Sequence, residues 1–213
     1  NKYNTALRFR NNLISKKPPH FREQINSIEE QFITLTYEVI AMRKSLLKEL
    51  NQYIGITFKN IFDESHQLEL EIDSKFSSFS MEDIKEFYKN SLEKDLIIGH
   101  TSSGAHRDDY TFHFDGYNSY EYCSLGQQKM SFLSLLFAYI ELFRYKFKTY
   151  PIVLIDDVSG ELDQRRWIKL IKFLESNDFQ VLITTANENF KTELEKIQDA
   201  QKIFIHDGRI EIL

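Results

Sequence analysis

The stretch Tyr150 to Asp163, YPIVLIDDVSGELD, constrains the fold more than any other part of the chain. Its apolar residues Ile152 to Ile155 follow one another without alternation. This pattern predicts a strand buried on both faces, as in a parallel sheet covered by helices. Two carboxylates, Asp156 and Asp157, come directly after it, and adjacent carboxylates repel unless a cation or hydrogen-bond donors hold them. The stretch therefore indicates either a Mg²⁺-holding strand beside a phosphate or a buried strand that ends in a polar turn.

The composition restricts the class of protein. The chain has 213 residues, of which 42% are hydrophobic and 28% are charged, as in a folded globular protein. No apolar run approaches the ~18 residues of a membrane span, and the first residues are not a signal peptide, so we expect a cytoplasmic protein without membrane contact. Cys123 is the only cysteine, which excludes an internal disulfide and fits a reducing compartment. The net charge of −5 predicts that any contact with nucleic acid is local.

A long helical hairpin is predicted for residues 1–55. Residues 1–15 can form a helix, which Pro18 and Pro19 interrupt. Apolar residues then recur with spacings of four and three, at Phe21, Ile25, Ile28, Phe32, Leu35, Val39, Met42 and Leu46. This period of 3.5 is typical of a coiled-coil helix, and the ordinary alternative is a helix packed on a globular core. We expect an antiparallel arm with the two prolines at its tip.

Basic residues gather in this hairpin, ahead of Glu23. Arg8, Arg10, Lys16 and Lys17 could contact the DNA backbone, or they could simply form a solvated face.

The remaining residues, 56–213, alternate between strand and helix patterns, which predicts an α/β domain. Ser80 and Asp83 have the spacing of a capping box at the start of a helix. Strands are expected at 68–72, 110–114 and 179–184, helices at 124–146 and 165–175, and a closing hairpin at 202–205 and 209–212 around Asp207-Gly208.

Ser124 and Gly126 stand at the start of one predicted helix, in the sequence SLGQQK. Free backbone N–H groups and the helix dipole make such a start suitable for an anion. The ordinary alternative is a serine N-cap with no ligand.

Three stretches in order, GAHRDD, SLGQQK and IVLIDDVSGELD, followed by ITTA, closely resemble the RecF family of DNA replication and repair ATPases, within the ABC/SMC-like group. The resemblance extends over nearly the whole chain, including YNTALRFRNNLI at the start of the arm. The sequence departs from the family pattern at Ala105, Leu125 and Lys129. Lys129 keeps the charge of the usual arginine without its bidentate fork.

The resemblance implies a role for each matched residue. Asp156 would hold Mg²⁺, through water, and Asp157 would orient and deprotonate the attacking water. The signature motif, which contacts the γ-phosphate of ATP on the other subunit, would comprise Ser124, Gly126, Gln127, Gln128 and Lys129. The D-loop at the dimer interface would comprise Ser159, Gly160, Glu161, Leu162 and Asp163. Thr184 and Thr185 occupy the switch region, while His106, Arg107 and Asp108 match a family motif that is either a structural ion pair or catalytic.

The resemblance also implies the fold and the partners. The chain would be the C-terminal half of an ABC-type P-loop ATPase head with a coiled-coil arm, because no G-x-x-x-x-G-K-[ST] occurs in the sequence and the family carries that loop before the arm. The intact protein would bind ATP and Mg²⁺, form a homodimer on ATP binding, recognise single-strand/double-strand DNA junctions and act with recombination mediator proteins. The alternatives are a non-catalytic interaction module that works through the hairpin, or another SMC-like ATPase.

Overall fold

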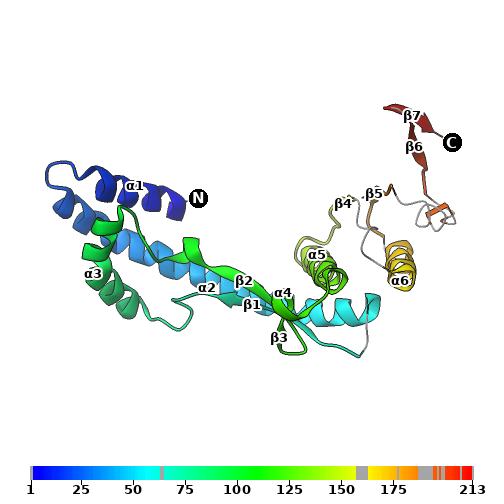
Figure 1. The fold of residues 1–213 in the computed structure, drawn as a ribbon, viewed down its shortest axis with the longest axis horizontal. Helices are drawn as coiled ribbons and strands as arrows, with labels where there is room; N and C mark the ends of the chain where they lie inside the picture. The colour runs from blue at the N-terminus through cyan, green and yellow to red at the C-terminus, as the bar shows by residue number, and fades with distance from the viewer. Residues whose placement is uncertain are drawn as a thin grey trace. The chain divides into compact units, whose positions relative to one another are not determined.

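The computed structural model describes residues 2–62, 65–156, 163–176, 178–186, 194–195, 197, 200–206 and 208–212. The chain forms two compact units (Figure 1). The first comprises Asn1–Glu49 and Leu70–Thr111, and the second comprises Leu50–Glu69 and Phe112–Leu213. This division differs from the predicted one at residue 55, because residues 70–111 share a hydrophobic core with the N-terminal helices.

The first unit contains the predicted hairpin. Helix α1 (Lys2–Lys16) is followed after a short turn by the long helix α2 (Phe21–Ile61), and α3 (Met81–Ile98) packs beside them. The Tyr3 ring stacks on Phe32 with centroids 5.6 Å apart, so the start of α1 lies against the middle of α2. At the other end of α1, Leu13 and Ile14 form a cluster with Ile25. These contacts confirm an antiparallel hairpin.

The predicted coiled-coil seam holds only over the first part of α2. Ile25 and Phe32 are fully buried, as expected. Farther along, Met42 is 63% exposed and Leu46 is also exposed, while Ile40 and Leu47 are buried in their place. An α-helix has 3.6 residues per turn, so a 3.5-residue seam drifts ~20° per heptad unless the helix supercoils. The predicted coiled-coil seam is therefore wrong beyond Val39. The buried residues of α2 instead follow the ordinary period of an α-helix.

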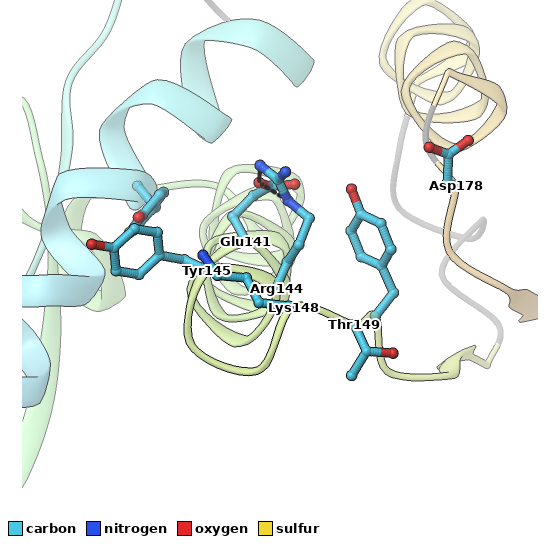
Figure 2. Close-up of a pocket in the computed structure, with 8 residues that line it drawn as sticks. Glu141, Arg144, Tyr145, Lys148, Thr149 and Asp178 are labelled. Carbon is cyan, nitrogen blue, oxygen red and sulfur yellow. Dashed lines mark hydrogen bonds and ion pairs between the residues drawn. The ribbon is translucent and has the colours of Figure 1, made fainter.

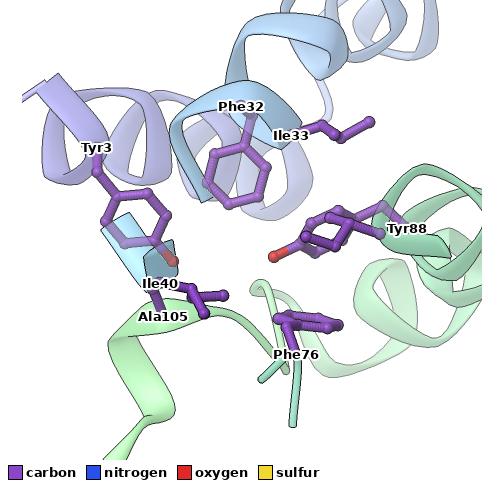
Figure 3. Packing of buried hydrophobic residues seen from close by; sticks show 8 residues of the cluster. Tyr3, Phe32, Ile33, Ile40, Phe76, Tyr88 and Ala105 are labelled. Atoms are coloured by element: carbon purple, nitrogen blue, oxygen red, sulfur yellow. The ribbon is translucent and has the colours of Figure 1, made fainter. Parts of the chain in front are cut away.

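One aromatic core joins the three helices to the loop after α3. It consists of Tyr3, Phe32, Ile33, Ile40, Phe76, Ile84, Tyr88 and Ala105 (Figure 3). Ala105 comes from the loop and is fully buried there, so the core fixes the position of the loop as well as of the helices. The predicted capping box of α3 is confirmed: Ser80 Oγ accepts from Asp83 N, and Asp83 Oδ2 accepts from Ser80 N.

Three short strands follow one another in the order β1-β2-β3. They are β1 (Leu68–Asp73), β2 (Asp109–Phe114) and β3 (Tyr117–Asn118). β2 and β3 pair antiparallel, with Phe114 opposite Tyr117 across the Asp115-Gly116 turn, where both turn residues have positive φ. A single 3₁₀ turn, Ala105–Arg107, precedes β2, and the short helix α4 (Ser119–Tyr122) follows β3.

The second unit contains the predicted α/β elements. Helix α5 (Leu125–Phe147) leads to strand β4 (Val153–Ile155), then α6 (Gln164–Glu175) and strand β5 (Val181–Ile183). β4 and β5 pair in parallel, with Ile155 opposite Ile183. Strands β6 (Ile203–His206) and β7 (Arg209–Ile212) form the predicted closing hairpin, with His206 opposite Arg209.

Strand β4 is not buried on both faces within this chain, contrary to the prediction. Val153 and Ile155 are buried, but Leu154 between them is 71% exposed, and Leu182 on β5 is exposed as well. The buried face packs in a unit whose core includes Trp167 and Phe137. An unbroken run of apolar residues is expected both for a strand covered on its two faces and for a strand with one face exposed in this chain. The sequence pattern alone therefore does not distinguish them.

Candidate nucleotide-binding half-site

The acidic end of β4 is the first part of the candidate site. Asp156 directly follows the strand, and its Oδ1 accepts a hydrogen bond of 2.5 Å from the Thr184 hydroxyl. The Thr184 N–H donates to the carbonyl of Ile155, so Thr184 sits at the corresponding end of β5. The parallel pair thus places an exposed carboxylate and a hydroxyl at one edge of the sheet, where ligands of α/β folds bind. Asp157, the predicted base, lies outside the described residues.

The signature stretch forms a second candidate surface, at the start of α5. Ser124 caps α5: its Oγ accepts from Gln127 N at 3.3 Å, and Gln127 Oε1 accepts from Ser124 N at 2.9 Å. This reciprocal capping box satisfies the third backbone donor of the helix. The N–H groups of Leu125 and Gly126 belong to the first turn, which has no intrahelical acceptor. The start of α5 therefore presents backbone donors and a serine hydroxyl to an exposed surface.

Gln128 does not share that surface. Its Nε2 donates to the carbonyls of Ser119, Tyr120 and Cys123, at 3.3, 3.4 and 3.2 Å. These carbonyls belong to α4 and its end, so Gln128 holds the signature helix against the preceding turn. Lys129 is half-buried in the first turns of α5. These contacts give the Gln128 amide nitrogen a structural role, and the expected contact of Gln128 with ATP stays a prediction.

The D-loop is described only at its last residue. Asp163 caps α6 by accepting from Arg166 N at 2.9 Å, and its carboxylate pairs with the Arg166 guanidinium at 3.1 Å. Ser159, Gly160, Glu161 and Leu162 lie outside the described residues. Thr185, the second residue of the expected switch region, is half-buried and follows Thr184.

The GAHRDD stretch is tied to the hairpin by polar contacts in the first unit. His106 Nε2 lies 3.2 Å from the carbonyl of Thr101, and its Nδ1 lies 2.9 Å from the Tyr3 hydroxyl. Since a carbonyl only accepts, Nε2 carries the proton and Nδ1 accepts from Tyr3. Burial lowers the pKa of His106, so the ring is neutral in this arrangement. Burial also raises the pKa of Tyr3 to about 12, which keeps its hydroxyl protonated as the donor.

Asp108 in the same stretch is part of an ion pair. Its side chain is almost fully buried and accepts from the Arg43 guanidinium at 2.6 Å. Arg43 also donates to the carbonyl of Ala105. Arg107 is exposed and lies 3.3 Å from His100 Nε2. These contacts favour the structural role of the motif over the catalytic one.

One of the four residues that were predicted to contact DNA is buried in the first unit. Arg10 is fully buried, and its guanidinium donates to Asp95 at 2.8 Å and to Thr101 Oγ1 at 2.7 Å. It also lies over the rings of Phe32 and Tyr88. Arg10 is therefore a core residue, and the prediction that it contacts DNA is wrong. Arg8, Lys16 and Lys17 are exposed on α1 and the turn after it.

Sequence reasoning missed two residues that position the loop, Arg43 and Asp95. Arg43 falls on the buried stripe of α2, between Ile40 and Leu47, and Asp95 continues the inner face of α3 beyond Leu92. A charged residue on the apolar face of a helix requires a partner when buried. The position of each residue on the apolar face of its helix could therefore have identified both from the sequence.

A pocket of about 390 Å³ lies in the second unit, at the opposite end of α5 from the signature stretch (Figure 2). Its walls carry both signs of charge together with tyrosine rings. They are formed by Tyr53, Glu141, Arg144, Tyr145, Lys148, Thr149, Tyr150 and Asp178. None of the residues that line the pocket is one assigned to the nucleotide half-site.

Two kinds of feature are absent from the part of the chain that the structure describes. It holds no cluster of three or more histidine, cysteine or acidic side chains that could bind a metal ion. None of its helices is both long and apolar enough to cross a bilayer.

Curated relatives match this chain over nearly its whole length. The chain is 31% identical over 98% of its length to the DNA replication and repair protein RecF of Streptococcus suis strain 05ZYH33, and 32% identical over 99% to that of Streptococcus agalactiae serotype V. It spans 57% of the length of each. No protein-family model matches the chain.

Solved structures show the same fold. The recombination mediator protein RecF with ATP covers 100% of this chain at a TM-score of 0.79 and 24% identity, and the chain spans 57% of that structure. An SMC ATPase studied for ATP-driven dimerisation covers 82% at a TM-score of 0.52 and 13% identity.

The parallel β4–β5 pair, the capped helix α5 and the long hairpin have the fold of the C-terminal half of an ABC-type head, the fold that the solved RecF and SMC structures share. Within that class, the chain belongs to the RecF family of DNA replication and repair proteins.

Proposed function

We propose that this chain is the signature and Walker B portion of a DNA replication and recombinational repair ATPase. The observation that carries the proposal is the parallel β4–β5 pair, which ends in Asp156 and Thr184 at one edge. Phosphoryl transfer requires positioning and charge neutralisation more than covalent chemistry. An exposed carboxylate at a strand end and a capped helix start suit those two tasks.

Asp156 fits a role in holding Mg²⁺, because an exposed carboxylate beside a hydroxyl is an oxygen donor set of the kind that this ion prefers. The ion would neutralise charge on the ATP phosphates. Asp157 would orient and deprotonate the attacking water. The Ser124 hydroxyl and the first N–H groups of α5 would bind the γ-phosphate of a nucleotide held by a second subunit, so ATP would join two subunits.

The assignment of DNA as the partner has two supports. The relatives are named DNA replication and repair proteins, and one solved relative is described as a recombination mediator. Residues 1–22 contain no acidic residue, although the chain as a whole carries a net charge of −5. The exposed side chains of Arg8, Lys16 and Lys17 supply a local positive surface suited to phosphates. We propose that it contacts DNA at single-strand/double-strand junctions in gaps, where the cytoplasmic protein supports recombinase loading.

The first experiment concerns nucleotide binding. The 213 residues contain no Walker A motif, so we expect this chain alone to bind ATP weakly or not at all by calorimetry. Supplying the Walker A half of a RecF protein in the same assay should restore binding. Tight binding of ATP by this chain alone would contradict the assignment.

The second experiment separates the two parts of the half-site in a protein that also carries the Walker A half. Asp157→Asn should retain ATP-dependent dimers in analytical ultracentrifugation and stop hydrolysis. Ser124→Arg should abolish ATP-dependent dimerisation while the monomer still binds ATP. Unchanged turnover in the first variant would remove Asp157 as the base, and persistent dimers in the second would remove the signature assignment.

A further inference from the structure

The last turns of α5 carry aromatic and basic residues in close alternation. Residues 143–150 read FRYKFKTY, which contains four aromatic rings, three cations and no acid. With Tyr139 one turn earlier, the side chains that matter here are Tyr139, Phe143, Arg144, Tyr145, Lys146, Phe147 and Lys148, which we call the aromatic-basic cluster. It lies entirely within the second unit.

Three rings of the cluster form a row along one face of α5. The Tyr139 and Phe143 centroids are 6.2 Å apart, and those of Phe143 and Phe147 are 4.6 Å apart. Their spacing of four residues places them one above another on the helix. Phe147 at the end of the row is 63% exposed, and Tyr139 is also exposed. The row thus presents ring surface to solvent at the end of the helix.

Cations lie beside these rings. The Lys148 ammonium is 4.9 Å from the Tyr145 centroid, and the Arg144 guanidinium is 5.7 Å from that of Tyr150. Figure 2 shows Arg144, Tyr145 and Lys148 leaving the last turns of α5 around the 390 Å³ pocket. Arg144 is held in place by Glu141, through contacts of 2.7 and 3.1 Å. The helix dipole explains cations in a last turn, but it does not explain exposed rings between them.

We propose that the aromatic-basic cluster binds single-stranded DNA. Surfaces for single strands combine cations that follow the phosphates with aromatic side chains on which unpaired bases stack. Bases within a duplex are already stacked and offer no free face, so the exposed rings favour a single strand. The choice of DNA rests on the proposed function of the chain. The cluster is nevertheless a separate site, because α5 at ~1.5 Å per residue places it about 30 Å from Ser124.

The test measures binding of the 213-residue chain to a fluorescent oligothymidine of about 15 nucleotides by anisotropy, without nucleotide, over a range of salt concentrations. Two variants probe the cluster. Lys146→Gln/Lys148→Asn removes two charges, and asparagine tolerates the positive φ at position 148. Phe147→Leu keeps an apolar side chain but removes a stacking ring. The matched control is Lys89→Gln/Lys94→Gln, two exposed lysines in the first unit.

We expect the double lysine variant to weaken binding and to reduce the slope of log affinity against log salt by about 1.4, at ~0.7 per lost phosphate contact. Phe147→Leu should weaken binding about fivefold or more, with the salt slope unchanged. The control variant should bind as the original chain does. Fluorescence of the fully buried Trp167 monitors the fold of the second unit in every variant.

Three outcomes would overturn the proposal: no binding of the oligonucleotide by the original chain, equal losses in the control variant, or full affinity in Phe147→Leu. If Arg8→Gln/Lys16→Gln weakens binding while the cluster variants do not, α1 is the DNA surface and the cluster is not. None of these results bears on ATP-dependent dimerisation, which ultracentrifugation measures separately, so the two proposals can fail independently.

Discussion

The Arg10 guanidinium and the Asp95 carboxylate lie 2.8 Å apart, and both side chains are buried in the first unit. Arg10 comes from α1 and Asp95 from the last turn of α3. Asp95 also accepts from the backbone N–H and the hydroxyl of Ser102, and Asn11 accepts from Thr101 N. This ion pair therefore connects the hairpin to the start of the loop that carries GAHRDD.

Removing Arg10 should destabilise the first unit strongly. Arg10→Met leaves the Asp95 carboxylate buried without its cation, which costs about 3–5 kcal/mol in comparable pairs. Urea unfolding followed by far-UV circular dichroism measures the change. The control is Arg22→Gln, since Arg22 pairs with Glu93 on the surface and exposed pairs contribute little. Equal effects of the two substitutions would show that the buried pair is not a principal contact.

Gly104→Ala should disturb the polar contacts around His106. Gly104 has φ of 154°, and a Cβ there would lie 2.7 Å from the Tyr3 hydroxyl and 2.9 Å from His106 Nδ1. We expect a loss of roughly 2 kcal/mol or more, because backbone strain adds to these close contacts.

Gly116→Ala is the matched comparison for that substitution. Gly116 also has positive φ, but nothing lies within 4 Å of its added Cβ, so it should lose only about 1 kcal/mol. Similar losses in both variants, measured by urea unfolding, would mean that the crowding at Gly104 is unimportant.

The stability of the first unit should depend on pH through His106. Burial lowers the pKa of His106 in the folded state, so below about pH 6.5 the unfolded chain binds a proton that the folded chain does not. Stability should therefore fall as pH drops from 7.5 to 5.5. His106→Gln should show a smaller fall than the original chain. His20→Gln, at an exposed position, should retain the full pH dependence.

Substitutions of Ser124 should separate its capping role from its phosphate contact. Ser124→Ala loses the cap and about 1 kcal/mol of stability. Ser124→Asp keeps a good N-cap, so we expect the stability of the original protein, measured by thermal unfolding. Its negative charge would repel a phosphate, and ATP-dependent dimers of a protein that also carries the Walker A half should be lost. Dimers that persist in Ser124→Asp would contradict the phosphate contact.

Local patterns predicted the elements of this chain well. The capping box of Ser80 and Asp83, the capped start of α5 and the antiparallel pairing of β6 with β7 depend on neighbouring residues alone, and each forms as predicted. The parallel pairing of β4 with β5 also followed from apolar strands alternating with helices.

Long-range partners were not predictable from the sequence. Arg10 resembled its exposed neighbour Arg8, and only the packing of α3 against α1 buries it. Met42 was predicted to be buried on the seam of α2 but is exposed. Burial at this part of the helix depends on which elements pack beside it. Gln128 matched a phosphate-binding motif, but α4, which holds its amide, could not be placed from sequence spacing.

The capping box at the start of α5 uses only part of the hydrogen-bonding capacity of the Ser124 and Gln127 side chains. A serine hydroxyl has two lone pairs and one hydrogen, and the cap occupies a single lone pair. The amide of Gln127 likewise gives its oxygen to Ser124 and retains both hydrogens. An arriving phosphate would find these donors already oriented and would not have to unwind the first turn to reach them. The proposed closure of two subunits over ATP would then require no local refolding at this surface.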